Sequence, residues 1–148
     1  MFAGWYAVSL DEKGRVAVPA SFRHLLTKND GGPLYLTPHL ADGKPRIQVY
    51  PAAKFIQLAE QIEAMDDQDQ AELLKDGLIG RAVAVELDGQ GRIVLPQWLR
   101  EEGGLHNGRV AVVGQIGRFD IWDESRYHTR HDNTDPDRLK QALKLIKR

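Results

Sequence analysis

The sequence predicts an α+β fold built from two copies of one unit, in which a strand, a tight turn, a second strand and a short helix follow one another. Residues 10–23 and 87–100 share the pattern apolar-Asp-x-x-Gly-Arg-apolar-x-apolar-Pro-x-x-apolar-Arg. Their first aspartates, Asp11 and Asp88, are 77 residues apart (88 − 11) in a chain of 148. Self-similarity of this kind indicates an internal duplication. In each copy, β-prone alternation before the proline changes to helical spacing after it.

The first copy begins with a strand at residues 5–10, followed by a turn and a second short strand. Asp11 can accept backbone N–H bonds inside the turn, and Gly14 can adopt the positive φ that closes it, so both are predicted to be structural turn residues. Pro19 suits the first turn of a helix. We expect this helix to end at the stop signal in residues 29–32.

Residues 34–37 and 46–50 read as a second strand pair around a loop that contains Pro38. Pro51 opens a helix whose predicted apolar face is formed by Phe55, Leu58, Ala59 and Ile62. An acidic break at residues 65–70 follows, and then a short helical piece that is expected to stop near the glycines at positions 77 and 80.

The second copy repeats this order, with a strand at residues 82–85, a turn at residues 88–91, a strand at residues 93–95 and a helix that starts at Pro96. Asp88 and Gly91 are its predicted structural turn residues, by the argument used for the first turn. Its second strand pair, residues 110–113 and 118–122, has a shorter turn, which changes the offset between copies from 77 to 72 (118 − 46). Such length changes are tolerated best in loops.

The pattern gives four segments: a first repeat at residues 5–53, a helical connector at 54–81, a second repeat at 82–125 and a helical tail at 126–148. In the tail, Leu139, Ala142, Leu143 and Ile146 form an apolar stripe flanked by lysines. We expect a final helix that packs on the body or on a neighbouring molecule. A basic helix that binds DNA or a membrane surface is the alternative.

Composition limits the function classes. The chain has 42% hydrophobic residues, no cysteine and a net charge of −1, which fits a globular protein without disulfides or a cysteine nucleophile. No apolar run reaches the roughly 20 residues of a membrane helix, so we expect a soluble cytoplasmic protein. His128 and His131 lack a third ligand at a usual spacing. We therefore predict no metal, no cofactor, no catalytic residues and no small-molecule substrate.

The Asp-x-x-Gly-Arg turns are the best candidates for a binding site, because they place long cations at hairpin tips. Lys13 and Arg15 in the first turn and Arg92 in the second could reach DNA phosphates, and an arginine fork can read guanine in the major groove. Ion pairs inside each turn are an equally open interpretation. Arg23 and Arg100 end the apolar helix faces, and either a solvated position or a DNA contact would suit them.

The motifs resemble one family. Met1-Phe2-x-Gly4, both Asp-x-x-Gly-Arg turns with their following prolines, and the segment Phe119-Asp120-Ile121-Trp122-Asp123 resemble the MraZ family of bacterial transcriptional regulators over residues 1–128. The resemblance implies tandem AbrB-like (swapped-hairpin) repeats that form one barrel-like unit, and a homo-oligomeric ring of such units. It also implies DNA contacts by Lys13 and Arg15, with Gln90 and Arg92 as the weaker copy.

The family resemblance further implies binding of double-stranded DNA at tandem short G-rich repeats in the promoter of the division and cell-wall gene cluster. The expected location is the cytoplasm, at the nucleoid. The alternative hypothesis is a non-catalytic interaction or scaffold module, in which the Asp–Arg pairs are internal and a protein partner is bound.

Overall fold

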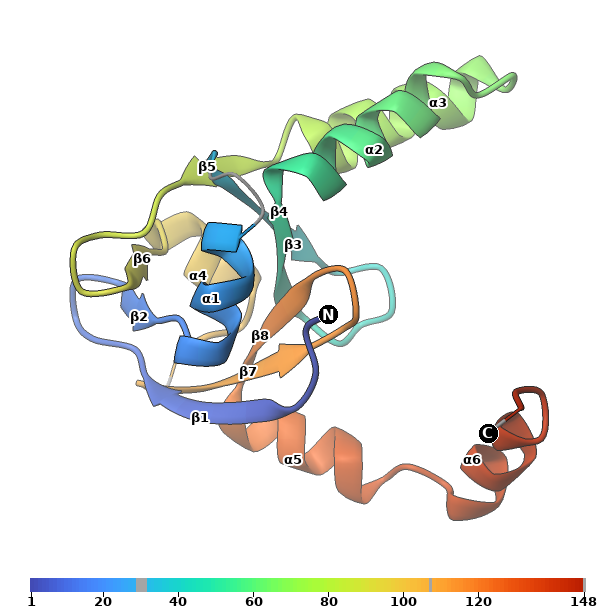
Figure 1. The fold of residues 1–148 in the computed structure, drawn as a ribbon. Helices are drawn as coiled ribbons and strands as arrows, with labels where there is room; N and C mark the ends of the chain where they lie inside the picture. Colours follow the sequence, from blue (N-terminus) through green and yellow to red (C-terminus); the bar gives the residue numbers. More distant parts are fainter. Residues whose placement is uncertain (29–31, 107, 148) are drawn as a thin grey trace.

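The computed structural model describes residues 1–28, 32–106 and 108–147 and confirms the α+β class (Figure 1). The first half contains β1 (Trp5–Ser9), β2 (Arg15–Ala17), α1 (Ala20–Lys28), β3 (Leu34–His39) and β4 (Arg46–Pro51). Next come α2 (Ala52–Glu63), α3 (Gln68–Leu74) and a π-helical turn (Lys75–Ile79). The second half contains β5 (Val83–Val85), β6 (Arg92–Val94), α4 (Gln97–Glu102), β7 (Arg109–Gly114) and β8 (Phe119–Asp123), and α5 (Glu124–Asp132) and α6 (Pro136–Leu143) follow it. The predicted stop signal of α1 falls largely on residues 29–31, outside the described residues.

The duplication seen in the sequence is a two-fold arrangement in space. Six strands form an antiparallel sheet in the order β1-β7-β8-β4-β3-β5, and β2 pairs with β6 in a separate sheet. The counterparts in the two copies are β1 and β5, β3 and β7, and β4 and β8. When each strand is exchanged for its counterpart, the same order results, read from the opposite edge of the sheet. At the centres of the two sheets, Val16 pairs with Ile93 and Gln48 pairs with Asp120. These partners are 77 and 72 residues apart, as the sequence offsets require (93 − 16 and 120 − 48).

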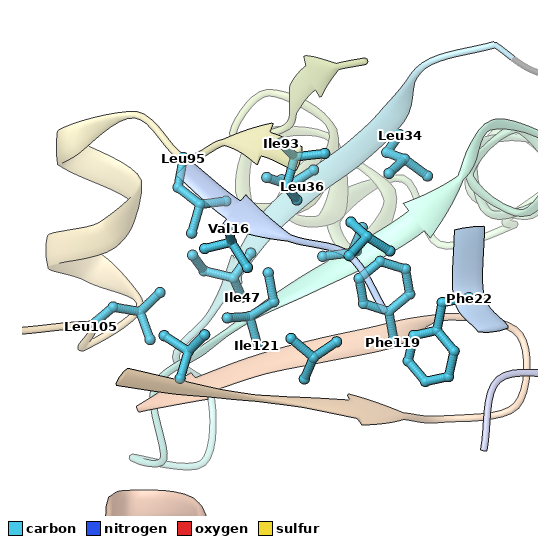
Figure 2. Close-up of a cluster of buried hydrophobic side chains, with 14 of the residues drawn as sticks. Val16, Phe22, Leu34, Leu36, Ile47, Ile93, Leu95, Leu105, Phe119 and Ile121 are labelled. Atoms are coloured by element: carbon cyan, nitrogen blue, oxygen red, sulfur yellow. The ribbon is translucent and has the colours of Figure 1, made fainter. Parts of the chain in front are cut away.

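The copies exchange strands and share one core. The first strand of each copy pairs with a strand of the other copy, β1 with β7 and β5 with β3. Apolar side chains from both copies are buried together between the sheets, and Figure 2 labels Val16, Phe22, Leu34, Leu36, Ile47, Ile93, Leu95, Leu105, Phe119 and Ile121. Neither copy can therefore complete its core alone, and this is compatible with the implied swapped-hairpin barrel.

One loop is shorter than predicted. Pro38, which the sequence placed in the loop between β3 and β4, lies within β3 opposite Ile47. In the described sheet, β3 pairs with β5 only from Leu34 to Leu36. The edge of β3 is therefore unpaired beside Pro38, and an edge position tolerates the missing N–H of proline.

The acidic break is also shorter than predicted, because α3 begins at Gln68. The carboxylate of Asp67 accepts a hydrogen bond from the backbone N–H of Gln70 at 3.1 Å and caps the helix. The helical path continues through Gly77 as a π-helical turn that ends at Ile79, within the predicted stop at residues 77–80. Residues 52–79 form a helical arm that projects away from the sheets (Figure 1).

The final helix does not pack on the body, which was one of the two places expected for it. Within the described residues, α6 has no buried side chain; Leu139 is 54% exposed, and Ile146, which lies beyond the end of the helix, is 60% exposed. In Figure 1, α6 stands away from the sheets at the end of α5. Helix α5 does pack on the body, through Tyr127 against Ala111, Val113 and Trp122. No helix in the described ranges is both long and apolar enough to span a bilayer.

Candidate nucleic-acid interface

Asp11 organises the first turn. Its Oδ1 accepts hydrogen bonds from the backbone N–H groups of Lys13 and Arg15, at 3.0 Å and 2.9 Å. Its Oδ2 accepts from Arg15 Nε at 2.6 Å. The carboxylate thus shapes the turn and fixes the direction of the Arg15 guanidinium at the same time.

The second turn repeats this geometry. Asp88 Oδ1 accepts from the backbone N–H groups of Gln90 and Arg92, at 2.8 Å and 2.9 Å, and Oδ2 accepts from Arg92 Nε at 2.9 Å. Gly14 and Gly91 close the two turns with φ of +82° and +76°, a region that glycine enters without steric cost. The internal ion pairs considered from the sequence are therefore present in both copies.

The two turns are tied to each other. The backbone N–H of Leu95 donates to the carbonyl of Gly14 at 2.8 Å, and that of Val18 donates to the carbonyl of Gly91 at 3.0 Å. With the pairing of β2 and β6, these bonds connect each turn to the strand that leaves the other turn. The turns of both copies form one surface, at the end of the molecule where the loops before β2 and β6 lie (Figure 1).

Arg23 and Arg100 lie against the turn of the opposite copy. A Cβ built on Gly91 would lie 2.6 Å from Arg23 Cδ and Nη1, and one built on Gly14 would lie 3.1 Å from Arg100 Nε. Arg100 Nε donates to the carbonyl of Leu95 at 3.0 Å, whereas Arg23 Nε is buried without a hydrogen-bond partner among the described residues. The sequence suggested that both side chains are solvated at the ends of their helices. Neither is, because each packs against a turn.

The outer surface of the turns carries the candidate contact groups. Lys13 and Gln90 are exposed, and in the described chain only their backbone N–H groups form hydrogen bonds. The side chains of Arg15 and Arg92 are 32% and 28% exposed. Each donates to its carboxylate through Nε alone, so the terminal nitrogens have no hydrogen-bond partner among the described residues.

The two carboxylates are held in their charged form. A hydrogen bond from the backbone N–H of Arg15 lowers the pKa of Asp11, although partial desolvation opposes this effect. The equivalent bond from Arg92 lowers the pKa of Asp88. Both ion pairs therefore persist at neutral pH, and the charge of each turn arginine is locally balanced.

A second polar cluster, which the sequence analysis missed, lies on the sheet face opposite the core. Asp120 is 2% exposed and accepts from Arg118 Nε at 2.9 Å, and Arg46 Nε lies 3.4 Å from its other oxygen. The Arg46 guanidinium also stacks 4.8 Å from the centre of the Trp122 ring and donates to Asp42 at 3.1 Å. The cluster ties the β3–β4 loop to β8. Its sequence signal was an arginine at the same position of both copies.

His128, one of the two histidines considered as metal ligands, has other contacts in the structure. His128 contacts the Trp5 ring edge-on at 4.9 Å, and its Nε2 lies 3.7 Å from Glu124 Oε1. Across the part of the chain that the structure describes, no group of three or more potential metal ligands is gathered.

Comparison with known proteins identifies the family to which the chain is similar. A family model described as "MraZ protein, putative antitoxin-like" matches residues 1–76 and 78–147. A protein of Alcanivorax borkumensis named Transcriptional regulator MraZ is 35% identical over 147 residues, which is 99% of either chain. Proteins of the same name from Shewanella piezotolerans and Pseudomonas putida are 37% and 38% identical, covering 86% of this chain and 82% and 83% of theirs. As its motifs predicted, the chain belongs to the MraZ family.

Proposed function

We propose that this protein is a non-catalytic, sequence-specific DNA-binding transcriptional regulator that binds DNA through its two turns. Lys13, Arg15, Gln90 and Arg92 are the proposed contacts. The observation that carries the proposal is the pairing of two turns of identical internal geometry into one surface with exposed cations. The names of the relatives, which are transcriptional regulators, support the same class of function.

The shape and chemistry of the turns suit the major groove. A two-stranded β-ribbon fits a groove about 12 Å wide, and an arginine fork pairs with guanine O6 and N7. Asp11 and Asp88 orient the guanidinium groups before DNA arrives, which reduces the ordering cost of binding. Lys13 has a flexible side chain suited to a phosphate. Arg23 and Arg100 act as positioning residues, because they hold the turns from behind.

The proposed target is the promoter of the division and cell-wall gene cluster, read as tandem short G-rich repeats by a ring of subunits in the cytoplasm, at the nucleoid. The charge of the turns supports multivalent binding. Asp11 and Asp88 balance the two turn arginines, so one subunit makes few net phosphate contacts. Linking several weak sites raises avidity on the order of 100-fold or more.

The first test measures binding of the protein to a DNA fragment upstream of its own gene. Arg15→Ala removes both the proposed DNA contact and the ion pair, whereas Asp11→Asn removes only the charge that pairs with Arg15. We expect Arg15→Ala to abolish specific binding and Asp11→Asn to retain most of it, while thermal unfolding shifts similarly in both. Equal binding by both variants and wild type would contradict the assigned role of Arg15.

A second test compares fragments that carry one repeat and three repeats. The proposal predicts binding to three repeats at least about tenfold tighter than to one, because the second and third contacts become intramolecular. Equal affinities for the two fragments would refute the ring-and-array part of the proposal and leave single-site DNA binding standing.

A further inference from the structure

The helical arm carries a concentrated negative charge. Residues 60–76 include seven acidic residues and one basic residue, Lys75. Lys75 lies 3.4 Å from Glu63 and 3.7 Å from Glu72, and Asp67 caps α3. The other acidic side chains form no ion pair with any described residue; they are Glu60, Asp66, Asp69 and Asp76.

The same arm exposes apolar side chains. Ile56, Leu73 and Leu74 are 54%, 66% and 38% exposed. Exposed apolar side chains on one element mark a candidate interaction surface, and the unpaired carboxylates on the same arm favour a partner of positive charge. The arm projects from the sheets (Figure 1), so its surface is accessible to a second molecule.

A groove with the opposite charge lies at the other side of the molecule. It has a volume of about 760 Å³ and is formed by the β3–β4 loop, α5 and the start of α6. Four cations line it, namely Lys44, Arg126, Arg130 and Arg138, together with the exposed Leu139 and a single acidic residue, Asp135. We call it the basic groove.

The cations of the basic groove are available for a partner. Within the described ranges, none of the four lies within 4.0 Å of a carboxylate. The Arg130 guanidinium stacks 4.8 Å from the centre of the Trp122 ring, a contact that leaves its charge unneutralised. The Asp135 carboxylate is itself used, because it accepts the backbone N–H of Asp137 at 3.0 Å and caps α6. The groove therefore combines unpaired positive charge with an uncovered leucine, which complements the acidic and apolar surface of the arm.

We propose that the helical arm of one copy docks in the basic groove of a second copy. The arm points away from the groove of its own chain, because the arm and helices α5 and α6, which contribute to the groove, project from opposite sides of the sheets (Figure 1). An α-helix of 12 residues such as α2 is about 18 Å long, enough to extend to a neighbour. The contact is head-to-tail, and head-to-tail contacts generate closed rings when the rotation closes. It thus gives a physical interface to the ring in the proposed function, on which it rests.

Charge reversal tests this contact. The arm variant carries Asp66→Lys and Asp69→Lys, and the groove variant carries Lys44→Glu and Arg138→Glu. We expect wild type to sediment as an oligomer of the 16.6 kDa chain and each variant to sediment as a smaller species with an unchanged melting temperature. A 1:1 mixture of the variants should recover the wild-type size, because each arm then meets a groove of opposite charge.

A matched control makes the same change of charge at two positions outside the basic groove. Lys140→Glu with Lys144→Glu alters the same tail outside the groove lining, and its assembly should equal that of wild type. Two outcomes would overturn the proposal: variants that keep the wild-type size, or a mixture of folded variants that stays small.

Binding of each variant to a single DNA repeat is measured alongside. Loss of assembly with retained single-repeat binding supports the contact, whereas a wild-type monomer that binds DNA refutes the contact and leaves the turns as the DNA site.

Cross-linking gives a direct measure of proximity, since the chain has no cysteine. One protein carries Asp69→Cys and the other Thr129→Cys, a residue that lines the groove. A short bismaleimide should link the two in a mixture, and replacing Thr129→Cys by Glu101→Cys should remove the product. Equal linking with Glu101→Cys, or no linking with Thr129→Cys, would show that the arm does not occupy the groove.

Discussion

Arg23, on α1, lies against Gly91 in the turn of the other copy, so closely that a Cβ on this glycine would be 2.6 Å from the arginine side chain. Arg100 lies in the reciprocal place against Gly14. Each proposed DNA-binding turn is therefore supported by a side chain that belongs to the opposite half of the chain. The rigidity of a turn depends on the fold of the copy that does not contain it.

This exchange predicts crossed effects in hydrogen exchange. Arg23→Ala removes the support behind Gly91, so the amides of residues 88–92 should exchange about tenfold faster, as a loss on the order of 1 kcal/mol implies. The amides of residues 11–15 should change less. Arg100→Ala should show the reverse pattern. An equal increase in both turns for either variant would contradict the crossed support.

The turn glycines should tolerate no side chain. Gly91→Ala forces a residue with a Cβ to φ +76° and against Arg23, so we expect a loss of stability on the order of 1–3 kcal/mol in urea unfolding. Gly89, two positions earlier, has open space around it, and Gly89→Ala should stay within about 0.5 kcal/mol of wild type. Similar losses for both variants would contradict the assigned geometry.

The β7–β8 turn stores strain at Ile116. This residue has φ +69° and is 72% exposed, and a β-branched side chain is disfavoured in that region. Ile116→Gly should therefore raise the free energy of unfolding by about 1 kcal/mol. Ile56→Gly, at an exposed position of α2, should lower it by about 1 kcal/mol instead. A decrease for Ile116→Gly, measured by thermal and urea unfolding, would show that the turn is unstrained.

Asp42 should contribute to acid sensitivity. Desolvation is the largest single influence and raises its pKa, but the backbone N–H of Lys44 and the Arg46 guanidinium outweigh it and lower the pKa from 3.8 to about 2. A folded-state pKa below the unfolded value stabilises the protein above about pH 3.8, and this contribution is lost as the pH falls towards 2.

Asp42→Asn removes this titration. The free energy of unfolding of wild type should therefore fall more steeply than that of the variant between about pH 4 and about pH 2, which is about 1 pH unit on either side of the middle of this window. Urea titrations at a series of pH values measure both slopes. Parallel slopes would show that Asp42 has the same pKa in the folded and unfolded chains.

The repeated pattern made much of the fold predictable, because spacing and turn chemistry are local. The strand pairs, the helix starts and the offsets that bring Val16 opposite Ile93 can be read from the chain. The exchange of strands between copies cannot, since similarity shows what is repeated and not which copy pairs with which. The position of Arg23 depends on that exchange, so its contact with Gly91 was out of reach of the sequence.

The other differences from the sequence prediction arise where a local feature outweighs the usual preference of a residue type for loops or for strands and helices. Pro38 stays in a strand because its edge is unpaired, and the Asp67 cap starts α3 inside the predicted break. The stripe of α6 was visible, but hydrophobic periodicity does not say what covers it. In the described chain its own body leaves Leu139 exposed.

The salt dependence of DNA binding by Lys13→Ala tests the central claim most directly. Lys13 is exposed and its side chain contacts no described residue through a hydrogen bond or ion pair, so its loss should leave folding unchanged. Lys140→Ala, on α6, is the matched control for the removal of one positive charge. Affinities for the upstream fragment are measured over a salt series, with melting temperatures in parallel.

If the turns bind DNA, Lys13→Ala should reduce the slope of log affinity against log salt by about 1 for each subunit bound to the fragment, and its melting temperature should equal that of wild type. Lys140→Ala should keep the wild-type slope. A wild-type slope for Lys13→Ala, above all with a reduced slope for Lys140→Ala, would contradict the account and move DNA binding from the turns to the tail.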